Sequence, residues 1–277
     1  EALGAENIRD ILAFICGDAQ QHFRVVHLSD AFTADSREGV FASPEARGGQ
    51  VKLAKFGNVT VEGIPFFIQD PVKSATGANI IVLKGGPSPD VHGQTFPAKV
   101  EVPLNVETKR LQILGGISGW GWPAVRDEAV ALQATVVYAS GEKESFALKN
   151  GIDIADYIRR VDVPGSQFVE SISDGQQVRL LTLKLTKKGI AKSLILESPN
   201  GNKTTPVVVA ITADIEGRVE AKGDKRPDPG QAKGKGKGKG KPEAAQGGPA
   251  APDSPKQGGQ GDGPLAPTTP VQWEAGK

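Results

Sequence analysis

Short segments in which apolar and polar residues alternate constrain the fold of this chain most strongly. Apolar side chains occupy every second position in Val100–Leu104 and again in Leu181–Leu185. A period of two is typical of a strand that turns one face to a core and the other to water. The chain is therefore predicted to fold mainly into half-buried β-strands.

Other segments with strand character follow one another along the chain, separated by turn residues. They are Phe23–Leu28, Val51–Phe56, Val59–Ile68 with a break near Gly63-Ile64-Pro65, Asn79–Lys84, Lys109–Leu114, Val130–Ala139, Glu144–Lys149, Ala191–Glu197 and Thr204–Ala213. About eleven short strands with few helical stretches predict an all-β fold, an antiparallel β-sandwich such as a jelly roll. The clearest hairpin is predicted across residues 140–143, and its alternation puts Leu132, Ala134, Val136 and Tyr138 on one face.

The two ends of the chain differ from this pattern. Ile8, Ile11, Leu12 and Ile15 have helical spacing and precede Gly17, so a helix is predicted within residues 1–20. From Gly217 to Lys277, 23 of 61 residues are Gly or Pro, and such a segment buries too little apolar surface to offset its ordering entropy. We therefore expect a helix at 1–20, a β-sandwich at 21–216 and a disordered linker at 217–277.

The sequence contains no recognisable catalytic motif. It lacks a G-x-S-x-G elbow, an H-E-x-x-H pair, a P-loop and a strand followed by G-x-G-x-x-G, so no catalytic residue and no cofactor are predicted. Cys16 ends an apolar helical stripe, which favours a packing role over a nucleophile. The sugar-hydrolase interpretation ranks third, because no acid/base pair of carboxylates is marked.

Metal, nucleic-acid and membrane sites are not predicted either. The three histidines have no metal-ligand spacing, and calcium binding by Asp30, Asp35 or Asp70 is open but matches no recognisable Asp-rich loop. The run Lys233–Lys241 alternates with glycine and has no aromatic residues, which favours a soluble spacer over a nucleic-acid site. No apolar stretch approaches the roughly 20 residues that span a bilayer, so no direct membrane insertion is expected.

The segment Arg110–Pro123 contains the most informative functional pattern. It has strand character at first and then contains four glycines interleaved with Trp120 and Trp122. Indole rings offer flat apolar faces with one N–H donor, so a surface for stacking on sugar rings is one interpretation. Arg126, Asp156 and Tyr157 are weaker candidates for polar contacts to sugar hydroxyls. The alternative interpretation makes both tryptophans lids on the core, with Tyr157 anchored in the core.

Several segments together resemble a known type of module. They are Asp35–Gly39, Gly63–Phe66, Asn79–Gly86, Leu114–Gly121, Lys149–Gly151, Asp156–Ile158 and Val208–Ala213. Over residues 23–214 the chain resembles the carbohydrate-binding-like β-sandwich, galactose-binding-like in architecture, of large multidomain secreted or membrane-associated proteins of planctomycete-type bacteria. The resemblance implies haem-binding or dehydrogenase-like and trehalose-utilisation-type neighbouring domains, with Glu6–Cys16 similar to the last helix of a cytochrome-c-like domain.

The expected function follows from the tryptophan segment and the resemblance together. The chain is expected to be a non-catalytic carbohydrate-binding module that attaches a larger extracytoplasmic enzyme, periplasmic or secreted, to a polysaccharide or glycan. Its expected partners are carbohydrate and the neighbouring domains of the same polypeptide. The alternative is a structural or protein-interaction domain that spaces two catalytic domains.

Overall fold

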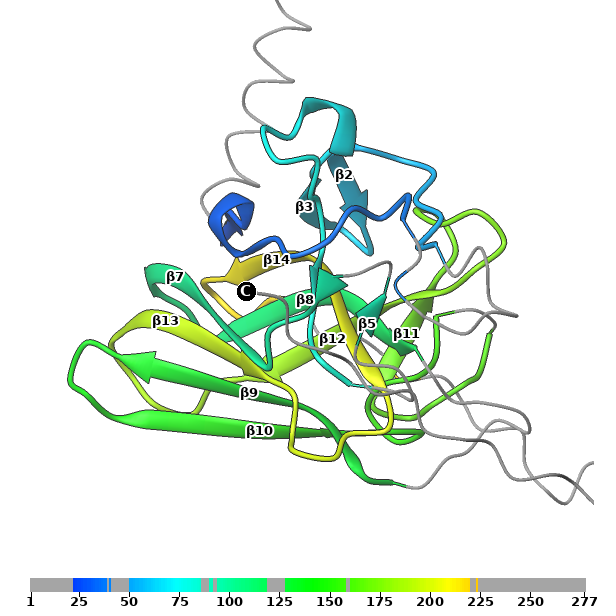
Figure 1. Cartoon of the computed structure of the whole chain (residues 1–277). Coiled ribbons are helices and arrows are strands. Elements are labelled where there is room, and N and C mark those ends of the chain that lie inside the picture. Colours follow the sequence, from blue (N-terminus) through cyan, green and yellow to red (C-terminus); the bar gives the residue numbers. More distant parts are fainter. Residues whose placement is uncertain are drawn as a thin grey trace, which may run out of the picture. The chain divides into compact units, whose positions relative to one another are not determined.

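The computed structural model describes residues 22–38, 40, 50–85, 90–91, 94–118, 128–157, 160–219 and 223 (Figure 1). All of these residues belong to one compact unit that spans Glu1–Pro229. The predicted helix at 1–20 lies outside the described residues, and so does nearly all of the predicted linker.

The described part is built of β-strands and two short 3-10 helices, η1 (Ser29–Ala31) and η2 (Pro71–Lys73). The strands are β1 (Phe23–Val26), β2 (Gly57–Val61), β3 (Ile64–Ile68), β4 (Ile81–Val82), β5 (Asp90–Val91), β6 (Gln94–Thr95), β7 (Lys99–Glu107), β8 (Arg110–Ser118), β9 (Val130–Tyr138), β10 (Lys143–Lys149), β11 (Ser166–Val169), β12 (Val178–Lys184), β13 (Ile190–Glu197) and β14 (Thr205–Asp214). Among the described residues, no helix is long and apolar enough to cross a membrane.

Two antiparallel sheets form the sandwich. The six-stranded sheet has the order β1-β14-β8-β12-β11. Its sixth strand, β4, lies on the same side of β14 as β1: β1 pairs with the second half of β14 and β4 with the first half. The four-stranded sheet has the order β10-β9-β13-β7. The strands β2 and β3 pair only with each other, as do β5 and β6. The predicted all-β, antiparallel sandwich is confirmed.

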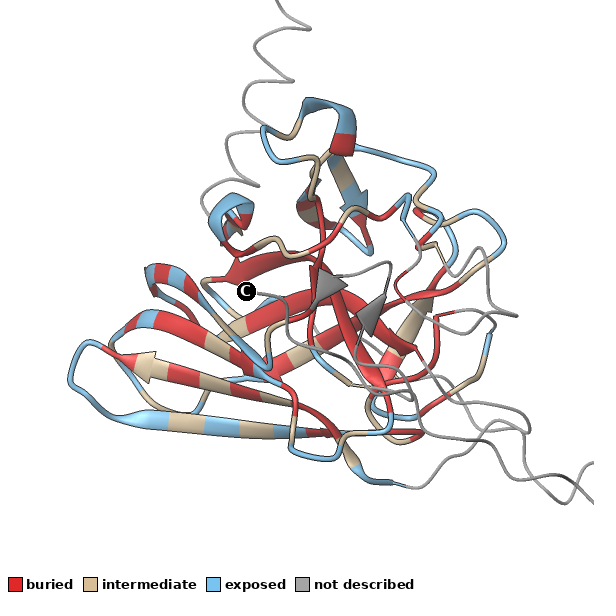
Figure 2. Cartoon of the chain, viewed as in Figure 1, coloured by how far each residue is buried: buried red, intermediate tan, exposed pale blue. Residues whose placement is uncertain are grey.

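A first hydrophobic core lies between the two sheets. It contains Leu111 and Ile113 from the six-stranded sheet and Val102 and Leu104 from the four-stranded sheet. The predicted inner face of β9 is confirmed, because Leu132, Ala134, Val136 and Tyr138 are all buried in this core. Side chains of alternate positions on β7 and β10 face outward, and both strands show mixed burial in Figure 2.

A second hydrophobic core covers the opposite face of the six-stranded sheet. The β2–β3 hairpin contributes Ile64, Phe66 and Ile68, which join Leu114 and Val209 in one buried cluster. The strands β8 and β14 are therefore buried on both faces, and they are almost continuously red in Figure 2. The six-stranded sheet is the middle layer of the described fold.

Some predicted elements differ from the observed ones. The segment Val51–Phe56 is not a strand, and only Leu53 forms an isolated bridge, to Ser173. The break predicted in Val59–Ile68 is a tight hairpin turn in which Glu62 and Gly63 both have positive φ, 51° and 78°. The strand β11 has no counterpart in the prediction, because its four residues show no clear alternation.

The fold also extends past the predicted boundary at residue 216. The carboxylate of Asp214, which is fully buried, accepts hydrogen bonds from the backbone N–H groups of Gly217, Arg218 and Val219. The carbonyl oxygen of Val219 accepts a hydrogen bond from Gln112 on β8. The first residues of the predicted linker therefore belong to the sandwich.

Candidate functional site

One end of the sandwich gathers the segments on which the functional prediction rests. The register places Ser118 at the end of β8 opposite Thr205 at the start of β14. It also places Lys149 at the end of β10 opposite Val130 at the start of β9. A hydrogen bond from Asn202, just before β14, to Ala131 O of β9 shows that these strand ends lie at the same end of the sandwich, which we call the loop end.

The tryptophan connection belongs to the loop end. Trp120, Trp122 and Arg126 lie in residues 119–127, outside the described residues. The two strands that flank this connection are well defined, because β8 ends at Ser118 in the six-stranded sheet and β9 begins at Val130 in the four-stranded sheet. The two strands that flank the tryptophan residues in the sequence therefore belong to different sheets.

Two of the four glycines in the tryptophan segment belong to β8 itself. The sequence predicts that the strand ends at Leu114, but it continues through Gly115 and Gly116 to Ser118. A Cβ atom on Gly115 would overlap the Val207 carbonyl oxygen of β14. On Gly116 it would lie 3.3 Å from the Ala155 carbonyl oxygen. These glycines allow close approach of neighbouring backbones, which is a packing role and not loop flexibility.

Asp156 and Tyr157 lie beside Ile117, close to the end of β8 where the tryptophan connection begins. The N–H of Ile117 donates to Ala155 O at 3.0 Å, and the N–H of Tyr157 donates to Ile117 O at 2.8 Å. The segment therefore pairs with the last residues of β8. Both side chains are buried, at 4% and 2% exposure, and burial together with the charge of Asp156 raises the pKa of the Tyr157 hydroxyl. We therefore leave both side chains out of the proposed contact set.

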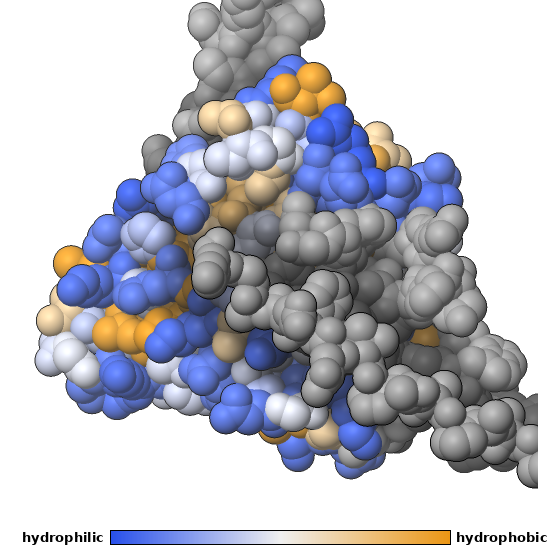
Figure 3. Space-filling model, in the orientation of Figure 1, coloured by the Kyte–Doolittle hydropathy of each residue, from blue (hydrophilic) through white to orange (hydrophobic). Residues whose placement is uncertain are grey.

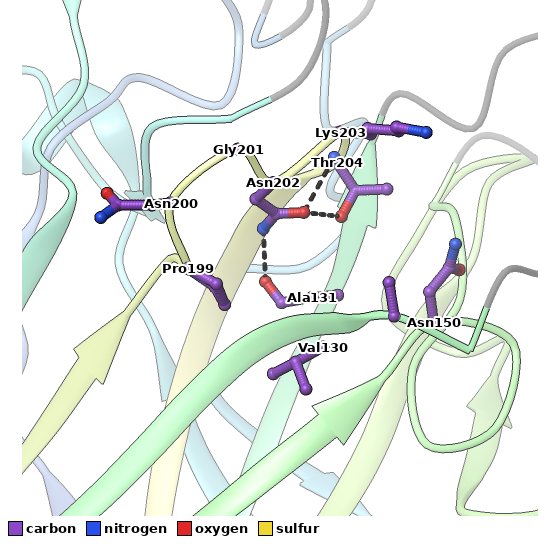
Figure 4. Close-up of a pocket in the computed structure, with 10 residues that line it drawn as sticks. Val130, Ala131, Asn150, Pro199, Asn200, Gly201, Asn202, Lys203 and Thr204 are labelled. Carbon is purple, nitrogen blue, oxygen red and sulfur yellow. Dashed lines mark hydrogen bonds between the residues drawn. The ribbon is translucent and has the colours of Figure 1, made fainter.

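A polar hollow of about 210 Å³ opens next to these segments (Figure 4). Its lining joins the start of β9, the residue after β10 and the β13–β14 connection. The lining residues are Ala129, Val130, Ala131, Asn150, Pro199, Asn200, Gly201, Asn202, Lys203 and Thr204. The tryptophan connection ends at residue 127, and Ala129 lies two residues further along the chain. The hollow therefore lies next to the point where that connection leads into β9.

Asn202 holds the β13–β14 connection in shape. Its Nδ2 donates to Ala131 O at 2.6 Å and to Ser198 Oγ at 3.0 Å. Its Oδ1 accepts hydrogen bonds from the backbone N–H and the hydroxyl of Thr204, at 3.0 and 2.9 Å. Figure 4 shows Asn202 at the centre of this network, whereas Asn200 and Lys203 extend away from it in different directions. Asn202 is a scaffold residue, and Asn200 and Lys203 are available to a ligand.

A second hollow of about 340 Å³ adjoins the first across the same connection. It is lined by Lys84, Gly85, Ala98 and residues 198–202. The Gly85 carbonyl accepts a hydrogen bond from the Thr205 hydroxyl at 2.8 Å, which fixes this segment to the start of β14. The Pro199–Asn202 turn therefore separates two hollows at the loop end.

A hollow of about 460 Å³, larger than both of these, lies between the β7–β8 turn and the β12–β13 connection, and its lining includes Glu107, Lys109 and Lys187. No group of three His, Cys, Asp or Glu side chains that could hold a metal occurs among the described residues. Asp70 accepts the Val72 N–H at the start of η2, and a hydrogen bond from Arg37 holds the pKa of the Asp35 carboxyl below its usual value. The surface in Figure 3 is mainly hydrophilic, and the large apolar side chains exposed in the described part are Phe56, Phe67, Val72 and Ile190.

The residues that line the hollows were missed by sequence reasoning. The string Ser198-Pro-Asn-Gly-Asn202 is a recognisable turn signal, but a turn signal does not indicate what lies across from it. Asn150 directly follows β10 and meets that turn only through the three-dimensional fold. Comparisons with known proteins add no assignment: the chain matches no family model, and no curated protein or solved structure shows significant similarity to it.

Proposed function

We propose that this β-sandwich is a non-catalytic carbohydrate-binding module whose loop end captures a polysaccharide or glycan. In this proposal Trp120 and Trp122 stack on sugar rings, Arg126 assists, and Asn200 and Lys203 contact sugar hydroxyls. The resemblance described above is the basis for placing the module in a larger extracytoplasmic protein, which it would attach to its glycan.

The observation that carries the proposal is how firmly the two strands that flank the tryptophan connection are held. Its first anchor, β8, is buried on both faces and hydrogen-bonded to β14 and β12 on either side. Its second anchor, β9, is a central strand of the four-stranded sheet. A binding loop fixed at both ends to rigid strands loses less entropy on binding, which supports ligand capture by the residues that it holds.

The chemistry of the adjoining hollow also supports a sugar ligand. An amide group can donate to and accept from sugar hydroxyls, and the exposed amide of Asn200 lines the hollow. Lys203 is the one charged side chain in that lining. Because an uncharged amide group is enough to bind sugar hydroxyls, we propose a neutral glycan.

One observation favours the alternative of a structural spacer domain. Two of the five residues predicted for sugar contact, Asp156 and Tyr157, have buried side chains. If the tryptophans are buried in the same way, the loop end has no stacking surface and the domain only spaces its neighbours. The following experiment separates the two functions.

The test is retention of the purified chain on insoluble neutral polysaccharides, such as cellulose, chitin, xylan, mannan and starch granules. The wild type is compared with the double variant Trp120→Ala/Trp122→Ala and with Trp273→Ala as the matched control, because Trp273 lies in the predicted linker. We expect one polysaccharide to retain the wild type and the control but not the double variant, with unchanged β-sheet circular dichroism.

Two outcomes would contradict the proposal. Failure of every polysaccharide in the panel to retain the wild type would remove glycan capture. Truncation of a buried Trp lowers the free energy of unfolding by several kcal/mol. A double variant that is destabilised by this much, or that does not fold, would favour the structural alternative.

A further inference from the structure

The chain contains two Asn-Gly pairs, and the fold brings both to the loop end. Asn150-Gly151 follows β10, and Asn200-Gly201 lies in the β13–β14 connection. In such a pair the backbone nitrogen of glycine can attack the asparagine side-chain carbonyl, because glycine has no side chain that crowds the ring closure. The two pairs have the same chemistry but different environments.

Asn200-Gly201 is open to this reaction. It occupies the two central positions of a turn closed by a hydrogen bond from Asn202 N to Pro199 O at 3.1 Å. Both residues are exposed, and Gly201 has a φ of 72°. No hydrogen bond joins the Asn200 side chain or the Gly201 N–H to another described residue. The fold therefore holds neither the attacking nitrogen of Gly201 nor the side-chain carbonyl of Asn200 in place.

Asn150-Gly151 is protected. The Asn150 side chain is 2% exposed, and its backbone N–H donates to Ala129 O at 2.9 Å. The attacking nitrogen of the reaction, Gly151 N, already donates its proton to Ile154 O at 2.9 Å. Ring closure here requires the local structure to open first, which lowers the rate by the equilibrium constant for opening.

We propose that Asn200 is a site of spontaneous deamidation in the folded protein and that Asn150 is not. The Gly201 nitrogen forms a bond to Asn200 Cγ, the bond from Cγ to Nδ2 breaks, and the Gly201 proton leaves with the amine as ammonia. Water then opens the resulting succinimide at either carbonyl, which leaves an aspartyl or an isoaspartyl linkage. The net change exchanges one amide for one carboxylate.

Deamidation places a negative charge in the described lining of the two hollows, which contains no carboxylate. The Pro199–Asn202 turn lines both hollows, whose other charged side chains are the cations Lys84 and Lys203. The isoaspartyl product also lengthens the backbone by one atom within this turn. Deamidation therefore changes the charge and shape of both hollows at once.

The test is incubation of the folded full-length chain at mildly alkaline pH, followed by tryptic digestion and mass spectrometry with fragment sequencing. Asn200 is expected in the peptide 193–203 and Asn150 in the peptide 150–159. We expect the mass gain of one amide-to-acid exchange at Asn200, on the order of tenfold or more faster than at Asn150. The exposed Asn58, which precedes Val59, is an internal control that should stay unmodified.

A parallel incubation in urea and one variant complete the test. In urea both Asn-Gly pairs should react at similar rates, because the protection of Asn150 belongs to the fold. Asn200→Gln should abolish the mass gain in the peptide 193–203. The proposal is overturned if Asn150 reacts as fast as Asn200 in the folded chain, if Asn150 stays protected in urea, or if Asn200 reacts only in urea.

Discussion

The two sheets of the sandwich differ in how many of their faces are buried. In the six-stranded sheet, all ten residues of β14 are buried, since one face meets the four-stranded sheet and the other meets the β2–β3 hairpin. In the four-stranded sheet, β7 alternates between buried and exposed residues. A strand covered on both faces has no polar side, so period-two alternation is visible only where water reaches one face.

The two sheets therefore contribute differently to the stability of the domain. The six-stranded sheet fixes β8, which leads into the tryptophan connection, and its stability rests on two hydrophobic cores. The four-stranded sheet completes one core and has polar side chains on its outer surface. We therefore expect substitutions to be less tolerated in the six-stranded sheet, and the predictions below test this expectation.

The largest effect is expected from core truncation in neighbouring pairs. Ile113 and Leu114 are consecutive in β8 and face opposite cores, so each change to Ala should cost about 2–5 kcal/mol. In β9, Val136→Ala should be destabilising, whereas Val137→Ala on the outer face should stay within about 0.5 kcal/mol. Unfolding in urea measures the free energy of unfolding of all four variants. Equal costs for Val136 and Val137 would contradict the one-sided burial of β9.

The next effect concerns the glycines of β8. Gly115→Ala places a methyl group against the Val207 carbonyl in the middle layer, so a loss of about 1–3 kcal/mol is expected. Gly116→Ala is the matched control, and its loss should be smaller because the nearest atom would lie 3.3 Å away. Thermal unfolding decides between them. A neutral Gly115→Ala would show that β14 does not approach β8 as closely as described.

A pair of truncations locates the end of the sandwich. Deleting residues 217–277 removes three N–H donors from the buried Asp214 carboxylate and should cost about 1–3 kcal/mol. Deleting only 224–277 keeps these donors, and the Gly- and Pro-rich composition predicts no measurable loss. A destabilisation of 1 kcal/mol corresponds to about 2–4 °C in melting temperature. Equal melting temperatures of the two truncated chains would place the boundary at residue 216.

The smallest effect is expected in the four-stranded sheet. Burial alone would raise the pKa of Glu144, but hydrogen bonds from the Tyr138 hydroxyl and from Thr186 lower it below its ordinary value of 4.5. A lowered folded-state pKa contributes stability above the unfolded pKa, and this is lost as pH falls through the folded pKa. Glu144→Gln should therefore cost about 1 kcal/mol at neutral pH. Its melting temperature should approach that of the wild type in acid, and a difference independent of pH would contradict this.

The sequence predicted the half-buried parts of the fold best. The hairpin that joins β9 to β10 and the inward face with Tyr138 follow from alternation next to water. The end of β8 was misjudged because Gly115 and Gly116 read as a loop, while the backbone of β14 that requires them is distant in sequence. The hollow lined by both Asn150 and Asn202 escaped prediction for a related reason, since these residues come to one hollow only when the sandwich forms.

The central claim is that a ligand contacts the tryptophan connection at the loop end, and the three indole N–H groups of the chain report on it directly. In a ¹H–¹⁵N correlation spectrum, assigned with the single Trp→Ala variants, the folded chain is titrated with a soluble oligosaccharide of the polysaccharide that retains it. We expect the signals of Trp120 and Trp122 to shift with saturation while that of Trp273 stays in place. Saturable binding that leaves the signals of Trp120 and Trp122 unmoved would contradict the account.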